Sequence, residues 1–330
     1  MDLRLVFLGT AGAVPTVDRA PSGLLVIRGG ERLLFDCGEG TQRQLMRSVG
    51  LARIDRVFIT HLHGDHFLGL PGLLKTFGLL GREEPLELYG PPGLEEILQV
   101  SHRLFGRFTY PLEVHEVGAG LVIDTGAYHI TATRTDHGPP SLAWCLDERP
   151  RPGRFHPEQA IALGVQPGPD FRRLQLGEPL VLASGVVVEP EQVMDEARSG
   201  RKIVVTGDTR PTESVVTLSH RATVLVHDAT FTESERPRAL ETRHSTAHEA
   251  AEVATRAGAR LLVLTHVSSR HGRRELLAEA RAVFRETLLP SDLDHLVVPY
   301  PEKGEPQLIA TGDGRDACYQ DWPETAKPVY

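Results

Sequence analysis

The chain has 330 residues, of which 40% are hydrophobic and 24% are charged, and its formal net charge is −8 at pH 7. Such a chain can bury a sizeable core, as one large domain or as one domain with an insertion. The negative net charge disfavours nucleic acid as a default partner. Phosphates are bound by local basic patches, however, which the net charge does not reveal. Three scattered cysteines, Cys37, Cys145 and Cys318, argue against a disulfide framework and for reduced, mostly buried thiols.

The beginning of the chain does not have the pattern of a signal peptide, because its short apolar run is broken at Gly9. No later apolar run is long enough to cross a membrane. We therefore expect a cytoplasmic protein.

Short strand-like runs alternate with helical patterns along the chain. Strands are predicted at residues 3–8, 23–28, 32–35, 56–60, 86–89, 128–133, 201–206 and 261–265. Helices are predicted at residues 40–50, 71–80, 92–105, 157–163, 248–257 and 273–288. Some neighbouring strands are joined as hairpins and others by a crossover helix, which indicates an α/β chain. The last two dozen residues are expected to form a loose tail.

Four potential metal ligands follow the strand-like run at residues 56–60: His61, His63, Asp65 and His66. In an extended segment alternate side chains point the same way, so the two histidines before Gly64 can converge on one ion. The turn at Gly64 directs the other two ligands toward a second ion. Imidazole plus carboxylate favours zinc, with iron or manganese as alternatives, and a site without thiolates is more often catalytic than structural. A histidine-rich surface loop is the alternative interpretation.

Further ligands stand where three later strand-like runs end: His137, Asp208 and His266. Two ions need three or four ligands each, and Asp208 can bridge them because its carboxylate has two oxygens. We predict that the first ion binds His61, His63, His137 and Asp208. The second ion is predicted to bind Asp65, His66, His266 and Asp208.

The motifs around these ligands occur in a characteristic order. They include Gly-Leu-Pro-Gly-Leu-Leu at residues 69–74, Gly-Asp-Thr-Arg-Pro at 207–211, His-Asp-Ala-Thr-Phe at 227–231 and His-Ser-Thr-Ala at 244–247. The chain thereby resembles the ribonuclease Z family, the tRNA 3′-processing endonucleases of the metallo-β-lactamase superfamily. The resemblance spans nearly the whole chain. The His-x-His-x-Asp-His element alone indicates only the superfamily, and the other motifs narrow it.

This resemblance implies an αββα sandwich with the metal site at the sheet edges between its two halves. It implies a zinc-dependent endoribonuclease that holds two Zn²⁺ per chain and removes 3′ trailers from precursor tRNA by two-metal hydrolysis. It also implies a homodimer in which the arm of one subunit grips the tRNA that the other subunit cuts.

Residues 148–202 correspond to the flexible tRNA-binding arm of the family, with a Gly-Pro element at Gly168-Pro169. The segment is too long for a connecting loop, and its sequence shows no core of its own. Five arginines in it are candidate phosphate contacts: Arg149, Arg151, Arg154, Arg172 and Arg173. Nearby acidic residues nearly balance their charge, so an ordinary solvated insertion is the alternative.

The resemblance also assigns catalytic roles. His244 is predicted to protonate the leaving 3′-oxygen, with Asp228 orienting it and raising its pKa. The chain departs here from the common family box, which carries Glu in place of Asp228. Asp65 is predicted to serve as ligand and as general base. Asp36 and His227 are expected to be structural or to orient ligands.

Two other function classes remain in view. One is a small-molecule phosphodiesterase or arylsulfatase on the same metal core, which would have no use for an RNA-binding arm. The other is a metal-bearing binding protein without turnover, which is disfavoured because the full ligand set is accompanied by His244. A flavodiiron-type site would carry Glu at the position of His63, and many zinc β-lactamases place Cys where Asp208 stands.

Overall fold

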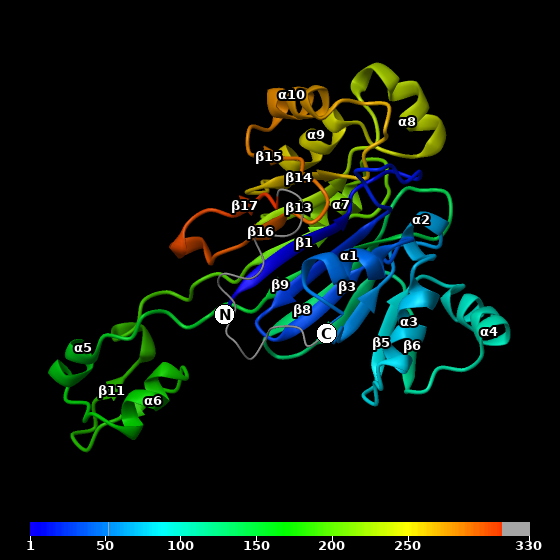
Figure 1. The fold of residues 1–330 in the computed structure, drawn as a ribbon. Helices are drawn as coiled ribbons and strands as arrows, with labels where there is room; N and C mark the ends of the chain where they lie inside the picture. Colours follow the sequence, from blue (N-terminus) through cyan, green and yellow to red (C-terminus); the bar gives the residue numbers. More distant parts are fainter. Residues whose placement is uncertain (52, 312–330) are drawn as a thin grey trace. The chain divides into compact units, whose positions relative to one another are not determined.

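The computed structural model describes residues 1–51 and 53–311 (Figure 1). The chain divides into two compact units. Unit 1 contains residues 1–125, 129–147 and the described chain from 201 onward, and unit 2 contains residues 126–128 and 148–200. In these ranges, no helix has both the length and the apolar character needed to cross a bilayer. Cys318 and most of the predicted tail lie outside the described residues.

The first sheet of unit 1 has the strand order β17-β16-β1-β2-β3-β4-β5-β6. Its strands are β1 (Leu3–Gly9), β2 (Gly23–Arg28), β3 (Glu31–Phe35), β4 (Arg56–Phe58), β5 (Leu86–Gly90), β6 (Leu112–Glu116), β16 (His295–Val297) and β17 (Gln307–Ile309). Strands β3 to β6 run parallel to one another. The helices between them are α1 (Thr41–Ser48), α2 (Gly64–Phe67), α3 (Leu70–Leu79) and α4 (Leu94–Phe105).

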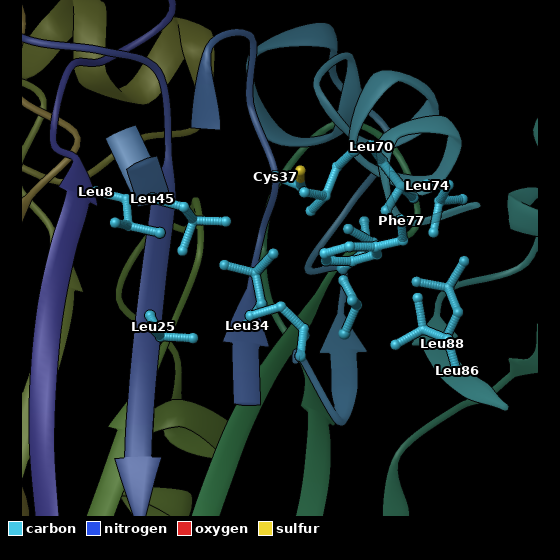
Figure 2. Packing of buried hydrophobic residues seen from close by; sticks show 14 of the residues in the cluster. Leu8, Leu25, Leu34, Cys37, Leu45, Leu70, Leu74, Phe77, Leu86 and Leu88 are labelled. Atoms are coloured by element: carbon cyan, nitrogen blue, oxygen red, sulfur yellow. The ribbon is translucent and has the colours of Figure 1, made fainter. Parts of the chain in front are cut away.

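Apolar side chains of this sheet pack against the helices beside it. Figure 2 shows Leu34 and Leu88 of the strands with Leu45 of α1 and Leu74 and Phe77 of α3. Fully burying a side chain of this kind contributes about 1.5–3 kcal/mol. The packing therefore holds the strands and the loops at their ends.

The second sheet has the strand order β15-β14-β13-β12-β9-β8-β7. Its strands are β7 (Gly120–Asp124), β8 (Tyr128–Arg134), β9 (Leu142–Glu148), β12 (Lys202–Val205), β13 (Val224–Asp228), β14 (Leu262–Thr265) and β15 (Thr287–Leu288). Strands β12 to β15 are parallel. The helices that follow them are α7 (Glu213–Leu218), α8 (Arg236–Thr242), α9 (Ala247–Ala257) and α10 (Arg273–Val283), with the 3-10 turn η2 (Glu233–Glu235) before α8. A further 3-10 turn, η3 (Pro301–Lys303), joins β16 to β17 of the first sheet.

Helix α9 illustrates how sequence produces packing in this half. Thr246 and Glu249 form a capping box at its start, which satisfies backbone donors that the helix cannot. Gly258 ends it at φ 62°, a left-handed conformation that favours glycine. Its buried face carries alanines at 250, 251 and 254, and their small side chains let the helix lie close to the sheet.

The two sheets meet through β4 and β9. The Phe58 and Trp144 rings contact edge to face, with their centroids 5.1 Å apart. The Trp144 indole donates to the Ile59 carbonyl at 3.3 Å, and the Leu142 amide donates to the Thr60 carbonyl at 2.9 Å. With helices on the outer faces of the paired sheets, unit 1 is the predicted αββα sandwich (Figure 1).

The structure corrects one predicted helix. Instead of running to residue 288, α10 ends at Val283, and Phe284 is extended at φ −132° and ψ 105°. Residues Thr287–Leu288 form β15, which pairs with β14. The helical pattern continues through these residues in the sequence, but pairing with a distant strand overrides it.

Unit 2 also differs from its prediction, because it has a small core. It contains α5 (Pro157–Ala162), α6 (Pro169–Gln175), β10 (Leu180–Val181), β11 (Val187–Val188) and the turn η1 (Pro190–Gln192). Its buried apolar residues are Ala160, Val165, Leu174, Leu180, Val188 and Val193. They come from short segments separated by prolines and glycines, and none of these segments is long enough to indicate a core by itself.

The two described cysteines, Cys37 and Cys145, are free and buried, as predicted. Burial raises the pKa of each thiol to about 12, so both stay protonated at neutral pH.

Candidate metal centre and its surroundings

The predicted metal ligands lie in loops that follow four strands. The His61–His66 segment follows β4, and the loops after β8, β12 and β14 carry His137, Asp208 and His266. His63 is the N-cap of α2, so the chain leaves the extended conformation there and turns into the helix that carries Asp65 and His66. One short segment can therefore contribute to two groups of ligands.

The first group consists of His61, His63, His137 and Asp208, whose candidate ligand atoms all lie within 4.8 Å of one another. His137 Nε2 is 3.0 Å from His63 Nδ1. Asp208 Oδ2 is 3.6 Å from His61 Nε2 and 3.8 Å from His137 Nε2. This is the ligand set predicted for the first ion.

The second group consists of Asp65, His66 and His266. Asp65 Oδ2 is 3.1 Å from His266 Nε2 and 3.5 Å from His66 Nε2. Asp208 Oδ2 lies 3.4 Å from each of these two imidazole nitrogens. The same carboxylate oxygen therefore borders both groups.

The spacing and burial of these atoms fit divalent metal. A tetrahedral ion with bonds of about 2.0–2.2 Å separates neighbouring ligand atoms by about 3.3–3.6 Å. His61 Nε2, His66 Nε2 and Asp208 Oδ1 are buried and lack a hydrogen-bond partner in the structure. Because buried polar atoms are rarely left unpartnered, these atoms fit a site that a cation would complete.

The other nitrogen of several ligand imidazoles is occupied. His66 Nδ1 donates to the Asp36 carboxylate at 2.7 Å, and His137 Nδ1 donates to the Arg243 carbonyl at 3.0 Å. His266 Nδ1 is 2.9 Å from the Thr230 hydroxyl. Such bonds select the tautomer that leaves Nε2 free to bind metal.

Asp36 occupies the orienting position expected for it. Besides His66 it accepts hydrogen bonds from the amide of Thr60 at 2.7 Å and from the Thr60 hydroxyl at 2.9 Å. Its backbone is left-handed, with φ 58°, as is that of His266, also at φ 58°. Non-glycine residues in such conformations cluster at functional sites, because the surrounding structure must hold them there.

Electrostatics keep the first group in the metal-binding form. Burial lowers the pKa of His61 well below its ordinary value, and burial also lowers that of His63. Both imidazoles are therefore neutral at pH 7, and a neutral imidazole is the form that binds metal.

Close backbone approach explains one glycine at the site. Gly207 precedes Asp208 and has φ 60°, and a Cβ there would lie 2.7 Å from the Thr60 Cβ. Any other residue would separate the β12 loop from the β4 loop. Glycine at this position therefore lets the two loops bring their ligands together.

His244 lies beside the two groups. Its Nδ1 donates to Asp228 Oδ2 at 2.9 Å and lies 3.9 Å from Asp208 Oδ2. Burial lowers the pKa of His244, but the Asp228 carboxylate outweighs burial and raises that pKa to about 9. Asp228 reaches the ring directly, although its side chain is shorter than the glutamate common in the family.

Hydrogen bonds fix the Asp228 carboxylate itself. Oδ1 accepts from the amide and hydroxyl of Thr230, and Oδ2 accepts from the amides of Thr209 and Ser245. His227 is also buried, but its Nδ1 donates to the Asp228 carbonyl, which is a structural role.

The remaining predicted residues lie elsewhere. All five candidate arginines belong to unit 2. Sequence interpretation missed several residues that surround the centre: Thr60, Thr230, Arg243 and Arg210. Thr230 stands in the His-Asp-Ala-Thr-Phe motif and Arg210 in the Gly-Asp-Thr-Arg-Pro motif. Thr60 acts through its hydroxyl and Arg243 through backbone contacts with the His137 loop, which residue type alone does not indicate. A third group of neighbouring side chains, Asp208, His244 and His266, shows that His244 is near enough to bind metal.

Comparisons with known proteins identify the family of the chain. Residues 31–267 match the β-lactamase superfamily domain. Ribonuclease Z of Methanosarcina acetivorans is 46% identical over 303 residues, covering 90% of this chain and 99% of that protein. Ribonuclease Z of Natronomonas pharaonis is 48% identical over 309 residues, covering 92% of this chain and 100% of that protein.

Among solved structures, human tRNase Z, short form, matches with a TM-score of 0.66 at 30% identity. The match covers 90% of this chain and 99% of that one. The resemblance inferred from the motifs and the αββα fold are both confirmed. The chain therefore belongs to the ribonuclease Z family of the β-lactamase superfamily and is a metal-dependent endoribonuclease.

Proposed function

We propose that this chain removes 3′ trailers from precursor tRNA by hydrolysing one phosphodiester bond at a site with two zinc ions. The observation that carries the proposal is that Asp208 Oδ2 lies within 3.4–3.8 Å of imidazole nitrogens from both ligand groups. Zinc suits a set of imidazoles and carboxylates, with manganese and iron as alternatives. The names of the relatives, ribonuclease Z and tRNase Z, support the substrate.

His61, His63, His137 and Asp208 would hold one ion, and Asp65, His66, His266 and Asp208 the other. Ions bound there supply an activated water and neutralise charge that develops on the phosphate. Asp65 accepts the proton of the attacking water. Its carboxylate also accepts a hydrogen bond from the Ala13 amide at 3.1 Å, which holds it in place.

His244 donates the proton that the leaving 3′-oxygen needs. Because Nδ1 is engaged by Asp228, the transferable proton is on Nε2. Asp228 stabilises the imidazolium and orients the ring, so the proton is available where the bond breaks.

We extend the proposal to unit 2 as the tRNA-gripping arm over residues 148–202, and to a cytoplasmic homodimer in which the arm serves the site of the partner subunit. Of its candidate phosphate contacts, Arg149, Arg154, Arg172 and Arg173 have exposed side chains. Arg151 is partly buried, and it donates to the Ser199 carbonyl at 3.4 Å. Unit 2 has eight acidic residues against six arginines from 148 to 200, so RNA binding would depend on how the arginines are arranged and not on the net charge.

The metal-loaded protein is expected to release the intact trailer from an end-labelled precursor tRNA and to leave a 3′-hydroxyl on the tRNA. Hydrolysis of bis-p-nitrophenyl phosphate by the same preparation reports on the metal centre alone. Turnover of this ester without any trailer release, with a correctly folded precursor, would replace the proposal with a small-molecule phosphodiesterase.

Reversing the arginines of unit 2 to glutamate, at positions 149, 151, 154, 172 and 173, is expected to weaken precursor binding and to flatten its salt dependence. The physical reason is that fewer phosphate contacts release fewer counterions. Binding is measured at several salt concentrations, and the aryl ester, which reaches the metals without the arm, should be hydrolysed at nearly the wild-type rate.

Glu158→Lys, an exposed acidic residue of the same unit, is the matched control and should not weaken binding. Mixing the arginine-reversed chain with Asp208→Ala chains tests the dimer, because a mixed dimer can join an intact arm to an intact site. No loss on either substrate would reject the role of the arm and identify the segment as a solvated insertion. Equal losses on both substrates would show that the substitutions damaged the fold or the metal site.

A further inference from the structure

Arg210 links three of the loops around the centre. It follows Asp208 by two positions, and its amide donates to the Asp136 carbonyl at 2.9 Å, beside His137. Its side chain is buried and extends to the His244 loop, where Nη1 donates to the His244 carbonyl at 2.6 Å. The same guanidinium makes two hydrogen bonds to Glu249, one of them from Nη1 at 2.6 Å.

Glu249 holds Arg210 in this position and is itself held. It is only 2% exposed, and Oε2 also accepts from the Thr246 amide at 3.0 Å. The rigid fork of an arginine matches a carboxylate with two donors, so Glu249 fixes the plane of the guanidinium. That plane is the one from which Nη1 reaches the His244 carbonyl.

The backbone of His244 is held by two hydrogen bonds: its amide donates to the Ala239 carbonyl at 2.9 Å, and its carbonyl accepts from Arg210. The preceding residue, Arg243, is left-handed at φ 57°. The following residue, Ser245, donates its amide to Asp228 at 3.3 Å. Arg210 bonds the His244 carbonyl, so together with the bond from the Ser245 amide to Asp228 it orients the peptide that follows the His244 side chain.

We propose that Arg210, fixed by Glu249, is a positioning residue that holds His244 where it can donate its proton. The inference rests on the proposed role of His244 as general acid. Arg210 touches neither ligand group through its guanidinium, so its loss should slow proton donation and leave the metal content unchanged. Small misplacements of a catalytic group lower turnover strongly.

The test compares two leaving groups. The 3′-oxygen of RNA needs a proton to leave, whereas p-nitrophenolate leaves as a stable anion. Arg210→Met should lower kcat on precursor tRNA by about 10-fold or more and change kcat on bis-p-nitrophenyl phosphate by less than about 2-fold. Arg210→Lys keeps the charge but lacks the two-nitrogen fork that matches the Glu249 carboxylate, so it should recover part of the loss.

A double-mutant cycle separates positioning from a general structural effect. If Arg210 acts through His244, then adding Arg210→Met to His244→Ala should not lower kcat on precursor tRNA any further. Two controls accompany it. Arg256→Met removes an exposed ion pair between Arg256 of α9 and Glu213, whose charged atoms lie 2.5 Å apart. Val253→Ala destabilises the buried face of the same helix. Both variants should keep turnover on both substrates.

Thermal unfolding and metal content are measured for every variant. If Arg210→Met does not fold, Arg210→Lys and Glu249→Gln decide the question, since each keeps a polar group in the buried pair. Equal losses on both substrates, loss of metal, or additive losses in the cycle would overturn the inference. If His244→Ala lowers turnover on both substrates equally, His244 is not the general acid and the inference about Arg210 fails with it. If His244→Ala lowers turnover on precursor tRNA alone and Arg210→Met does not, only the role of Arg210 is overturned.

Discussion

Replacing Asp208 with alanine is expected to remove most of both metal ions and to abolish turnover on every substrate. The reason is geometric: one carboxylate oxygen lies 3.4 Å from two histidines of the second group and 3.6–3.8 Å from two histidines of the first. A bridging ligand contributes to both sites, so its loss weakens both. Elemental analysis of carefully loaded protein measures the result, with about two ions per wild-type chain expected.

Asp136→Ala is the matched control, because this aspartate precedes His137 but belongs to none of the ligand groups found among the described residues. It should keep its metal. A wild type that saturates at one ion would contradict the two-metal proposal. An Asp208→Ala chain that keeps one full ion would show that Asp208 serves one group only.

Replacing His244 with alanine is expected to lower turnover on precursor tRNA by about 10²-fold or more, the usual effect of losing a general acid. Metal content should stay at the wild-type level, because Nδ1 of this ring is directed to Asp228 and Asp208 lies 3.9 Å away. Hydrolysis of bis-p-nitrophenyl phosphate should change little, since its leaving group needs no proton.

His248→Ala replaces the same residue type four positions along the chain, at a partly exposed site on α9, and should retain turnover. A His244→Ala chain that loses metal in step with activity would identify His244 as a ligand, in the third group with Asp208 and His266.

Much of unit 1 could be predicted from local patterns. Strand β2 has the predicted bounds, and helices α1, α3 and α4 begin and end within two residues of theirs. These elements combine strong periodicity with turn residues at their ends, which are local signals. Predictions were wrong at β15, where a helical pattern competes with pairing to a distant strand, and for the core of unit 2, whose apolar residues come from several short segments.

By itself, the sequence determined which side chains are available to bind metal and that they follow strand ends, because residue type and spacing along one segment settle both. The ligand atoms come from loops as far apart as Asp65 and His266, and only the packing of two sheets brings them within 3.1 Å. The tertiary structure alone decided that Asp208 borders both groups, that Asp228 reaches His244, and that Arg210 bonds the His244 carbonyl. Each of these depends on distances between chain segments, which no local pattern encodes.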